Sequence, residues 1–98
     1  MYIEKKTEGN TTIVSPVGRL DTTTSPDFEN EIKELYDTTE NLVIDMEKLD
    51  YISSAGLRVL LAVQKQMSGK GSMVIRNANE IVLEVFEVTG FVDVLNIE

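Results

Sequence analysis

A short apolar run followed by a strongly apolar helical pattern constrains most what this chain can fold into. Residues 41–46 are Asn-Leu-Val-Ile-Asp-Met, a run typical of a buried strand and compatible with a parallel sheet. From Ser54 onward, leucines and valines recur at helical spacing as far as Met67, which predicts the best buried helix of the chain. A buried strand that leads into a buried helix indicates an α/β fold.

Further strands are expected on both sides of this pair. A weak strand over residues 2–7 and a Thr- and Val-rich strand over residues 11–17 surround the turn signal at residues 8–10, which predicts a hairpin. Pro16 indicates an edge position or a bulge in the second of these strands, because proline cannot donate to a strand ladder. Residues 72–76 predict another short strand after the apolar helix.

Two more helices are marked by signals at their ends. Ser25 as N-cap, with a proline at the first helical position, predicts a helix that extends to the neighbourhood of Tyr36. Residues 77–79 are the predicted cap of a third helix, which Gly90 ends. Residues 91–97 are expected to close the chain as a final short strand or turn.

These elements predict a single domain over residues 1–98. The expected order is β-β-α-β-α-β-α-β, which predicts a mixed, mostly parallel sheet of about four to five strands with about three to four helices. The chain is 42% hydrophobic and 27% charged, as in an ordinary globular protein. Folding at this length buries roughly 65% of the surface of the unfolded chain, so one modest core can form.

The missing residue types exclude several kinds of chemistry. The chain has no cysteine and no histidine, so a disulfide, a zinc–thiolate site and a Ser-His-Asp triad are impossible, and we expect neither an enzyme nor a bound metal or cofactor. The formal net charge of −8 argues against nucleic acid and anionic membranes as partners. No segment resembles a signal peptide or reaches the ~20 apolar residues of a membrane span, so we expect a cytoplasmic domain.

Residues 49–58 contain the strongest candidate for a functional site. They join the buried strand to the buried helix, and residues 47–52 are expected to form a loop. In an open sheet with parallel strands, ligands and partners meet the loops at the carboxyl ends of the strands. Ser53 and Ser54 lie where the helix starts, and the unpaired amides and dipole of a first turn stabilise an anion, including a covalently attached phosphate. Two interpretations stay open at this point, since the serines either only cap the helix or include a phosphorylated residue.

Two other candidate sites are weaker. Asp21, Asp45 and Asp50 lie near strand ends and carry the oxygen ligands that magnesium favours. Their spacing matches no known ligand pattern, so capping or solvated roles are expected. Residues 68–72, Ser-Gly-Lys-Gly-Ser, lack the pattern of a phosphate loop and lead into a strand, so they predict a turn.

Three stretches make the chain resemble the STAS domains, and among them the stand-alone anti-sigma-factor antagonists of bacterial partner switching. The stretches are residues 18–21 (Gly-Arg-Leu-Asp), residues 42–45 with residues 52–57 (Leu-Val-Ile-Asp and Ile-Ser-Ser-Ala-Gly-Leu), and residues 85–91 (Val-Phe-Glu-Val-Thr-Gly-Phe). The middle stretch is quite specific, and together with the order of elements the likeness covers nearly the whole chain.

The resemblance implies a protein that is acted upon and is not itself a catalyst. In this family the unphosphorylated protein binds a serine kinase that is also the anti-sigma factor, and this frees the sigma factor. Phosphorylation of a serine at the start of the second helix breaks the complex, and a serine phosphatase restores it. The family motif, Asp-Ser-Ser/Thr-Gly-Leu-Gly, places this serine on Ser54, with Ser53 as the alternative acceptor.

The resemblance also predicts the docking surface. This surface consists of the loop after the second strand and the first turn of the second helix, with residues Asp21, Thr22, Thr23, Ser53, Ser54, Ala55, Gly56, Leu57 and Arg58. Two positions depart from the family motif, since Ser53 replaces its aspartate and Arg58 replaces its last glycine. Arg58 would lie near a phosphate on Ser54 and could pair with it, which would soften the charge switch or serve a different partner.

Other STAS functions remain open alternatives. The chain would then be a constitutive interaction subunit, for example of a lipid-transport complex, or a ligand-sensing module without a phospho-switch. Some members of the family regulate outputs other than sigma factors, such as secretion or two-component systems. We expect a monomer in each case, since the domain is small and acidic.

Overall fold

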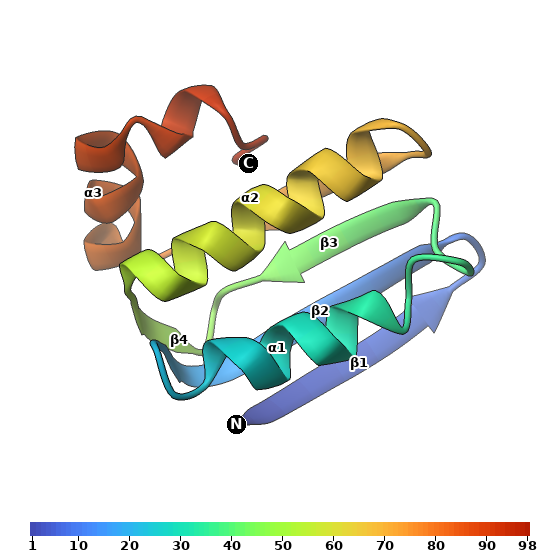
Figure 1. Ribbon diagram of the computed structural model, residues 1–98, viewed down its shortest axis with the longest axis horizontal. Coiled ribbons are helices and arrows are strands. Elements are labelled where there is room, and N and C mark those ends of the chain that lie inside the picture. Colours follow the sequence, from blue (N-terminus) through green and yellow to red (C-terminus); the bar gives the residue numbers. More distant parts are fainter.

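Five strands and three helices follow one another along the chain, and the computed structural model describes all residues, 1–98 (Figure 1). In order, the elements are β1 (Tyr2–Glu8), β2 (Thr11–Leu20), α1 (Ser25–Lys33), β3 (Asn41–Asp45), β4 (Leu49–Ile52), α2 (Ser54–Ser68), β5 (Ser72–Arg76), α3 (Glu80–Thr89) and a 3₁₀ turn, η1 (Phe91–Asp93). The predicted α/β fold with a mixed, mostly parallel sheet is confirmed. None of the helices has the length and hydropathy that crossing a membrane requires.

β2 is the central strand of the sheet. It pairs with β1 in an antiparallel hairpin and, along its other edge, in parallel with β3 and then with β4. β3 pairs in parallel with β5, so the strand order is β1-β2-β3-β5. β4 lies outside this order and pairs only with the last residues of β2. Gly9, with a φ of +61°, supplies the left-handed backbone that the tight turn between β1 and β2 requires.

Pro16 lies where β2 changes partners. β3 pairs with β2 as far as Val14, and β4 pairs with it from Gly18 onward, so this edge of β2 is unpaired at Pro16. A proline is tolerated in such a gap because no ladder bond is lost there. The prediction of an edge strand is wrong, since β2 is central, and the irregular pairing occurs nearby, between Gly18 and Arg19.

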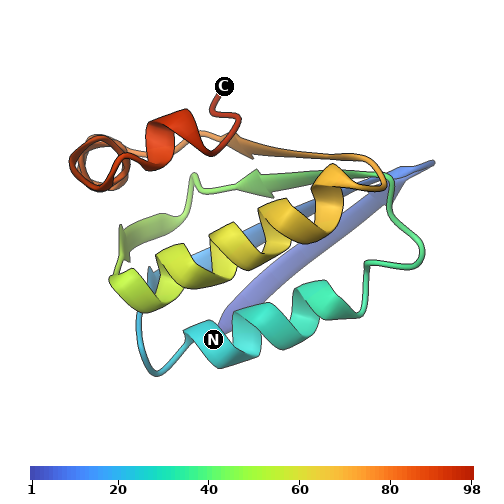
Figure 2. The same ribbon diagram turned by 45° about the horizontal axis from the view of Figure 1, so that its top comes forward.

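α1 and α2 lie side by side on one face of the sheet, and α3 packs against β4 at one end of the molecule (Figure 2). α2 contributes more buried residues than either other helix, as its apolar pattern predicted. The core between helices and sheet is almost free of solvent, and it includes Val14, Leu20, Phe28, Ile32, Leu42, Ile44, Ile52, Leu60, Val63, Met67 and Met73.

Two predicted segments differ from the structure in their secondary structure. Residues 47–52, expected to be a loop, contain β4, which is only four residues long and therefore too short to show a strand pattern in the sequence. After Gly90 the chain forms η1, and the expected final strand is reduced to a single bridge between Ile97 and Ile75. Gly90 itself, with a φ of +81°, ends α3 as predicted.

The ends of α1 also differ from the prediction. Thr24 and not Ser25 is the N-cap residue, because the carbonyl of Thr24 accepts the first bond of the helix, from the amide of Phe28 over 3.2 Å. The helix ends at Lys33, before Tyr36. Turns follow the helix, and the hydroxyl of the buried Thr39 then lies 2.9 Å from that of Thr12, which fixes the chain next to β2 just before β3 begins.

Candidate partner-docking site

Two loops meet where β2 and β4 end. These strands are parallel and pair at Leu20 and Ile52, so the residues that follow them leave the sheet at the same edge. The amide of Ser53 donates to the carbonyl of Leu20 over 2.9 Å, which joins the start of α2 to the loop at residues 21–24. The structure thus brings the two parts of the expected docking surface together.

Gly56 determines how closely α2 approaches the sheet. A Cβ at this position would lie 2.7 Å from Cγ1 of Ile52 and 2.9 Å from Cγ of Leu20, closer than carbon atoms pack. Both neighbours are fully buried in the core and have little room to move away. Glycine therefore allows the first turn of α2 to lie directly against the ends of β2 and β4.

The neighbouring serines at the start of α2 have different surroundings. Ser53 is the N-cap residue, with an extended backbone, but its Oγ bonds to no amide of the helix and is buried without a hydrogen-bond partner. Ser54 is the first helical residue, and its side chain is exposed. Capping by the hydroxyl of Ser53, one of the two open interpretations, is therefore not what the structure contains.

The first turn of α2 is left with free amides. Those of residues 54–56 donate to no protein group, and the first bonded amide is that of Leu57, which donates to the carbonyl of Ser53 over 3.0 Å. Free amides and the positive end of the helix dipole stabilise negative charge in front of the helix. The surroundings of Ser54 are therefore electrostatically suited to an anion.

The side chain of Asp21 holds the adjoining loop. Its Oδ1 accepts hydrogen bonds from the amides of Thr24, at 3.1 Å, and Thr23, at 2.9 Å. The hydrogen bond from the Thr24 amide, followed by that from Thr23, lowers the pKa of Asp21 below its ordinary value. The carboxylate thus shapes the loop, while Thr22 and Thr23 remain exposed at its surface.

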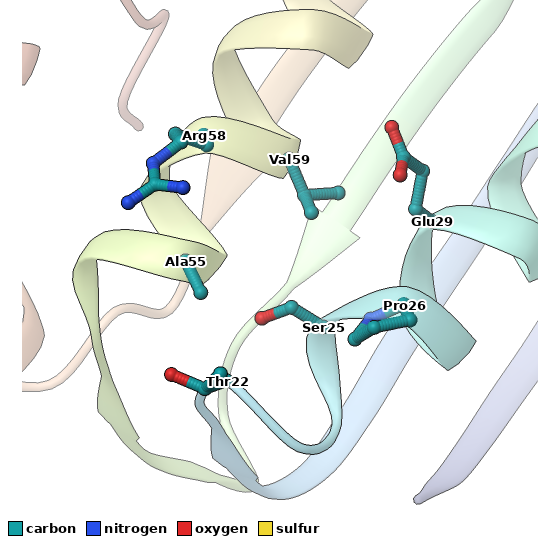
Figure 3. A pocket seen from close by; sticks show the side chains of 7 residues that line it. All are labelled: Thr22, Ser25, Pro26, Glu29, Ala55, Arg58 and Val59. Carbon is teal, nitrogen blue, oxygen red and sulfur yellow. The ribbon is translucent and has the colours of Figure 1, made fainter.

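A cleft of about 270 Å³ lies between the starts of α1 and α2 (Figure 3). Ser25 is only 3% exposed, and its Oγ, which has no hydrogen-bond partner, points from α1 toward α2 across this cleft. Arg58 and Glu29 lie at its edges on opposite helices, and neither forms an ion pair within the chain. The complete lining is Thr22, Ser25, Pro26, Glu29, Ala55, Arg58 and Val59.

Four lining residues were not among the expected site residues: Ser25, Pro26, Glu29 and Val59. Their contribution depends on how α1 packs beside α2, and helical periodicity does not specify that placement. The only signal in the sequence is the serine and proline pair at residues 25–26, which predicts a helix start and not a cleft.

Residues 2–98 match the STAS domain family. The chain belongs to this family. BtrV of Bordetella bronchiseptica, assigned by name to the anti-sigma factor antagonists, is 39% identical over 79 residues, which cover 79% of this STAS domain and 68% of BtrV. Such antagonists are binding regulators and not enzymes, as the residue composition of this chain predicted.

Solved structures show the same fold. An anti-sigma factor antagonist from Mycobacterium paratuberculosis superimposes with a TM-score of 0.90 at 21% identity, covering 98% of this STAS domain and 83% of that chain. The anti-sigma factor antagonist SpoIIAA of Bacillus gives TM-scores of 0.84 in its unphosphorylated form and 0.77 in its phosphorylated form, at 16% and 15% identity. These two alignments cover 99% of this domain in both cases and 88% and 91% of SpoIIAA.

The expected site residues of this STAS domain divide by exposure. Thr22, Thr23, Ser54 and Arg58 are exposed, whereas Asp21, Ser53 and Ala55 are half-buried. The other expected residues, Gly56 and Leu57, are buried in the core, and they position the surface without facing solvent. The accessible part of the expected docking surface thus consists of Thr22, Thr23, Ser54 and Arg58.

Two of the three carboxylates considered as magnesium ligands hold turns instead. Asp21 holds its own loop, and Oδ1 of Asp45 accepts hydrogen bonds from the amide of Glu47 and from Nδ2 of Asn77, each at 3.1 Å. The carboxylate of Asp50, by contrast, is exposed and accepts no hydrogen bond. No group of three or more carboxylates in the structure is placed to hold a metal ion.

Proposed function

We propose that this STAS domain is an anti-sigma factor antagonist that binds a serine kinase with anti-sigma activity, and that phosphorylation of Ser54 switches this binding off. The observation that supports the proposal is the exposed Ser54 at the first turn of α2, next to free amides and the cleft between α1 and α2. BtrV is named as such an antagonist, and SpoIIAA is known in an unphosphorylated and a phosphorylated form.

The accessibility of the two serines favours Ser54 over Ser53 as the acceptor. A kinase must bring the γ-phosphate of ATP in line with the attacking hydroxyl, which requires an open approach. Ser54 offers that approach, whereas Oγ of Ser53 is buried. Phosphorylation of Ser53 would first require its buried Oγ to become accessible.

The phosphate would act on docking and leave the fold intact. It adds about −1.5 to −2 charges, which the free amides at the start of α2 stabilise within the domain. On a chain with a net charge of −8, the added charge and its hydration shell repel an acidic partner surface and block close contact at the cleft. A serine phosphatase would restore binding by removing the group. In this scheme the domain works as a monomer in the cytoplasm, where the kinase and ATP meet.

Incubation with a candidate kinase and ATP, followed by mass mapping, tests the modification. We expect phosphate on Ser54, none in the Ser54→Ala variant, and unchanged incorporation in the Ser53→Ala variant. Absence of phosphate with every cognate kinase would support the alternative of a constitutive interaction subunit and refute the switch.

Calorimetric titration of the same kinase tests the docking step. Ser54→Ala should bind with the affinity of the unmodified protein, and Ser54→Asp should bind at least about tenfold more weakly, a loss of ~1.4 kcal/mol. Ser68→Asp is the matched control, because it adds the same charge to an exposed serine at the far end of α2. Equal weakening by both aspartates would show a general charge effect and contradict a local switch.

A further inference from the structure

The outer side of α3 carries an unusual concentration of exposed apolar side chains. Five large apolar residues of the chain are exposed, and two of them, Ile81 and Val88, lie on α3, whereas Val92 and Val94 lie in the segment that follows it. Within α3, Ile81 is 56% exposed and Val88 is 81% exposed. Single apolar residues scattered over a surface are ordinary, whereas a cluster points to a binding surface.

The cluster forms a stripe along the helix. Ile81, Val85 and Val88 are separated by four and three residues, so they lie on one side of α3. Val82 and Phe86 face the other way and anchor the helix in the core. The stripe, with Glu84 and Thr89, lines a shallow groove of about 240 Å³. It shares no residue with the cleft at the start of α2.

Charge along this part of the chain is strongly one-sided. Residues 77–98 contain no lysine or arginine, and the preceding Arg76 is already paired with Glu98 at 3.2 Å. The carboxylates in this segment are Glu80, Glu84, Glu87, Asp93 and Glu98. The three on α3 form no ion pair, so the apolar stripe lies beside an uncompensated row of negative charge.

We propose that the α3 groove, defined by Ile81, Glu84, Val85, Val88 and Thr89, is a second docking site that takes an amphipathic helix whose apolar side is flanked by lysine or arginine. The apolar residues of such a helix cover the stripe, and its basic residues pair with the free carboxylates. A second copy of this chain brings the same carboxylates and is repelled, as are anionic membranes and nucleic acids. α3 is roughly 15 Å long, so about three turns of a partner helix can lie along it.

Titration of the isotope-labelled full-length domain with synthetic peptides, followed by NMR, tests this site. The probe is a helical peptide of about four turns with a leucine stripe flanked by lysines. We expect saturable shift changes centred on residues 80–89, and an affinity that falls as salt rises. Two control peptides are used. One has the same residues in scrambled order, so that it has no leucine stripe, and the other has glutamates in place of the lysines. Neither should saturate this site.

Paired variants separate the stripe from general effects. Ile81→Ser with Val88→Ser should weaken binding of the leucine–lysine peptide at least about tenfold, whereas Val94→Ser, an exposed apolar change outside the groove, should leave it unchanged. If the double variant fails to fold, the variant with Glu80, Glu84 and Glu87 changed to glutamine replaces it, with loss of the salt dependence as the expected result.

Equal binding of the scrambled peptide, or shift changes that lie outside α3, would overturn the proposal. Concentration-dependent dimerisation through α3 in the absence of peptide, detected by sedimentation, would also overturn it by naming a second copy as the occupant. No kinase enters this experiment, so its failure leaves the proposed Ser54 switch untouched, and failure of that switch leaves the α3 groove untouched.

Discussion

The residues at the start of α2 are of two kinds: buried residues that position the helix on the sheet, and exposed residues that a partner can reach. Gly56 and Leu57 are buried and hold the turn against the sheet, while Ser54 and Arg58 are exposed on it. Asp21 supports the neighbouring loop through its carboxylate. Substitutions at the supporting positions are therefore expected to change stability, and substitutions that add charge or bulk at the exposed positions are expected to change binding.

Arg58 is expected to pair with a phosphate on Ser54. The two residues are four apart on one helix, and Arg58 forms no ion pair in the unmodified protein. In protein carrying phosphoserine at position 54, the guanidinium should lower the second pKa of the phosphate. Arg58→Gln should raise that pKa by about half a unit, since an exposed ion pair contributes ~0.2–1 kcal/mol.

A phosphorus NMR titration measures this pKa directly and needs no partner protein. Lys65→Gln, which removes a positive charge elsewhere on α2, is the control. An identical pKa in the wild-type and Arg58→Gln proteins would show that the arginine does not hold the phosphate.

Gly56→Ala should destabilise the domain by about 1–3 kcal/mol, because the new methyl group overlaps the side chains of Ile52 and Leu20 in a packed core. Gly69→Ala is the matched control: it lies at the other end of α2, where a Cβ meets no atom within 4 Å. Urea unfolding of both variants measures the difference. Equal stabilities would mean that the close contact of α2 with the sheet tolerates a larger residue.

Asp21 should make the stability of the domain depend on acid pH. Its folded pKa is lowered by the hydrogen bond from the Thr24 amide, so its contribution is fully present above the ordinary pKa of about 3.9. The contribution is lost as the pH falls through the lower, folded value. Asp21→Asn should thus be less stable than the wild type at pH 7, and this difference should shrink below about pH 3.9.

Chemical unfolding at a series of pH values checks this dependence. Asp50→Asn, at an exposed carboxylate without a hydrogen bond, should show no such dependence. A constant difference between Asp21→Asn and the wild type across the acid range would assign the loss to the amide side chain and not to charge.

The helices differ in how their first turns are satisfied. Oδ1 of Asn79 accepts from the amide of Val82 over 2.8 Å, and its Nδ2 donates to the carbonyl of Leu49 over 3.1 Å. α3 is therefore capped and tied to β4 by one side chain. α2 has no such cap, because the hydroxyl of Ser53 bonds to nothing.

This difference predicts that alanine substitutions at the two N-cap positions change the free energy of unfolding by different amounts. Asn79→Ala should lower the free energy of unfolding by about 1 kcal/mol or more, since two hydrogen bonds are lost. Ser53→Ala should be close to neutral. Thermal and urea unfolding of the two variants provide the comparison, and an equal loss in both would imply that Ser53 caps the helix in solution.

Elements with a strong local signal were predicted from sequence, and elements defined by tertiary contact were not. The spacing of leucines and valines predicted α2, and the cap at Asn79 with Gly90 predicted the ends of α3. β4 was not predicted, because its four residues become a strand only through pairing with β2. The cleft was not predicted for a similar reason, since it exists only where α1 and α2 lie side by side.

At the scale of the whole molecule, one edge of the sheet, that of β5, is partly covered by the chain itself. The amide of Ile75 in β5 donates to the carbonyl of Asn96 over 2.8 Å, and its carbonyl accepts from the amide of Glu98 over 2.9 Å. An uncovered strand edge can pair with another chain. Residues 96–98 thus act as a short cover for β5.

Removal of residues 96–98 should therefore promote self-association. We expect the shortened domain to form species larger than a monomer in sedimentation velocity as its concentration rises, whereas the full chain should sediment as a monomer. Glu98→Gln removes the ion pair to Arg76 but keeps the backbone bonds, and should behave like the wild type. A shortened chain that remains monomeric would show that the β5 edge needs no cover.

The separation of buried supports from exposed contacts has a consequence for cells that contain several STAS regulators. Thr22, Thr23, Ser54 and Arg58 face solvent, so three of them can vary between paralogues, around a retained Ser54, without disturbing Leu20, Ile52 or Gly56 beneath them. Under the proposed switch, duplicated copies would acquire different kinase partners through a few surface changes while they keep the same buried core. Signalling pathways that use this fold in the same cell would then not cross-react.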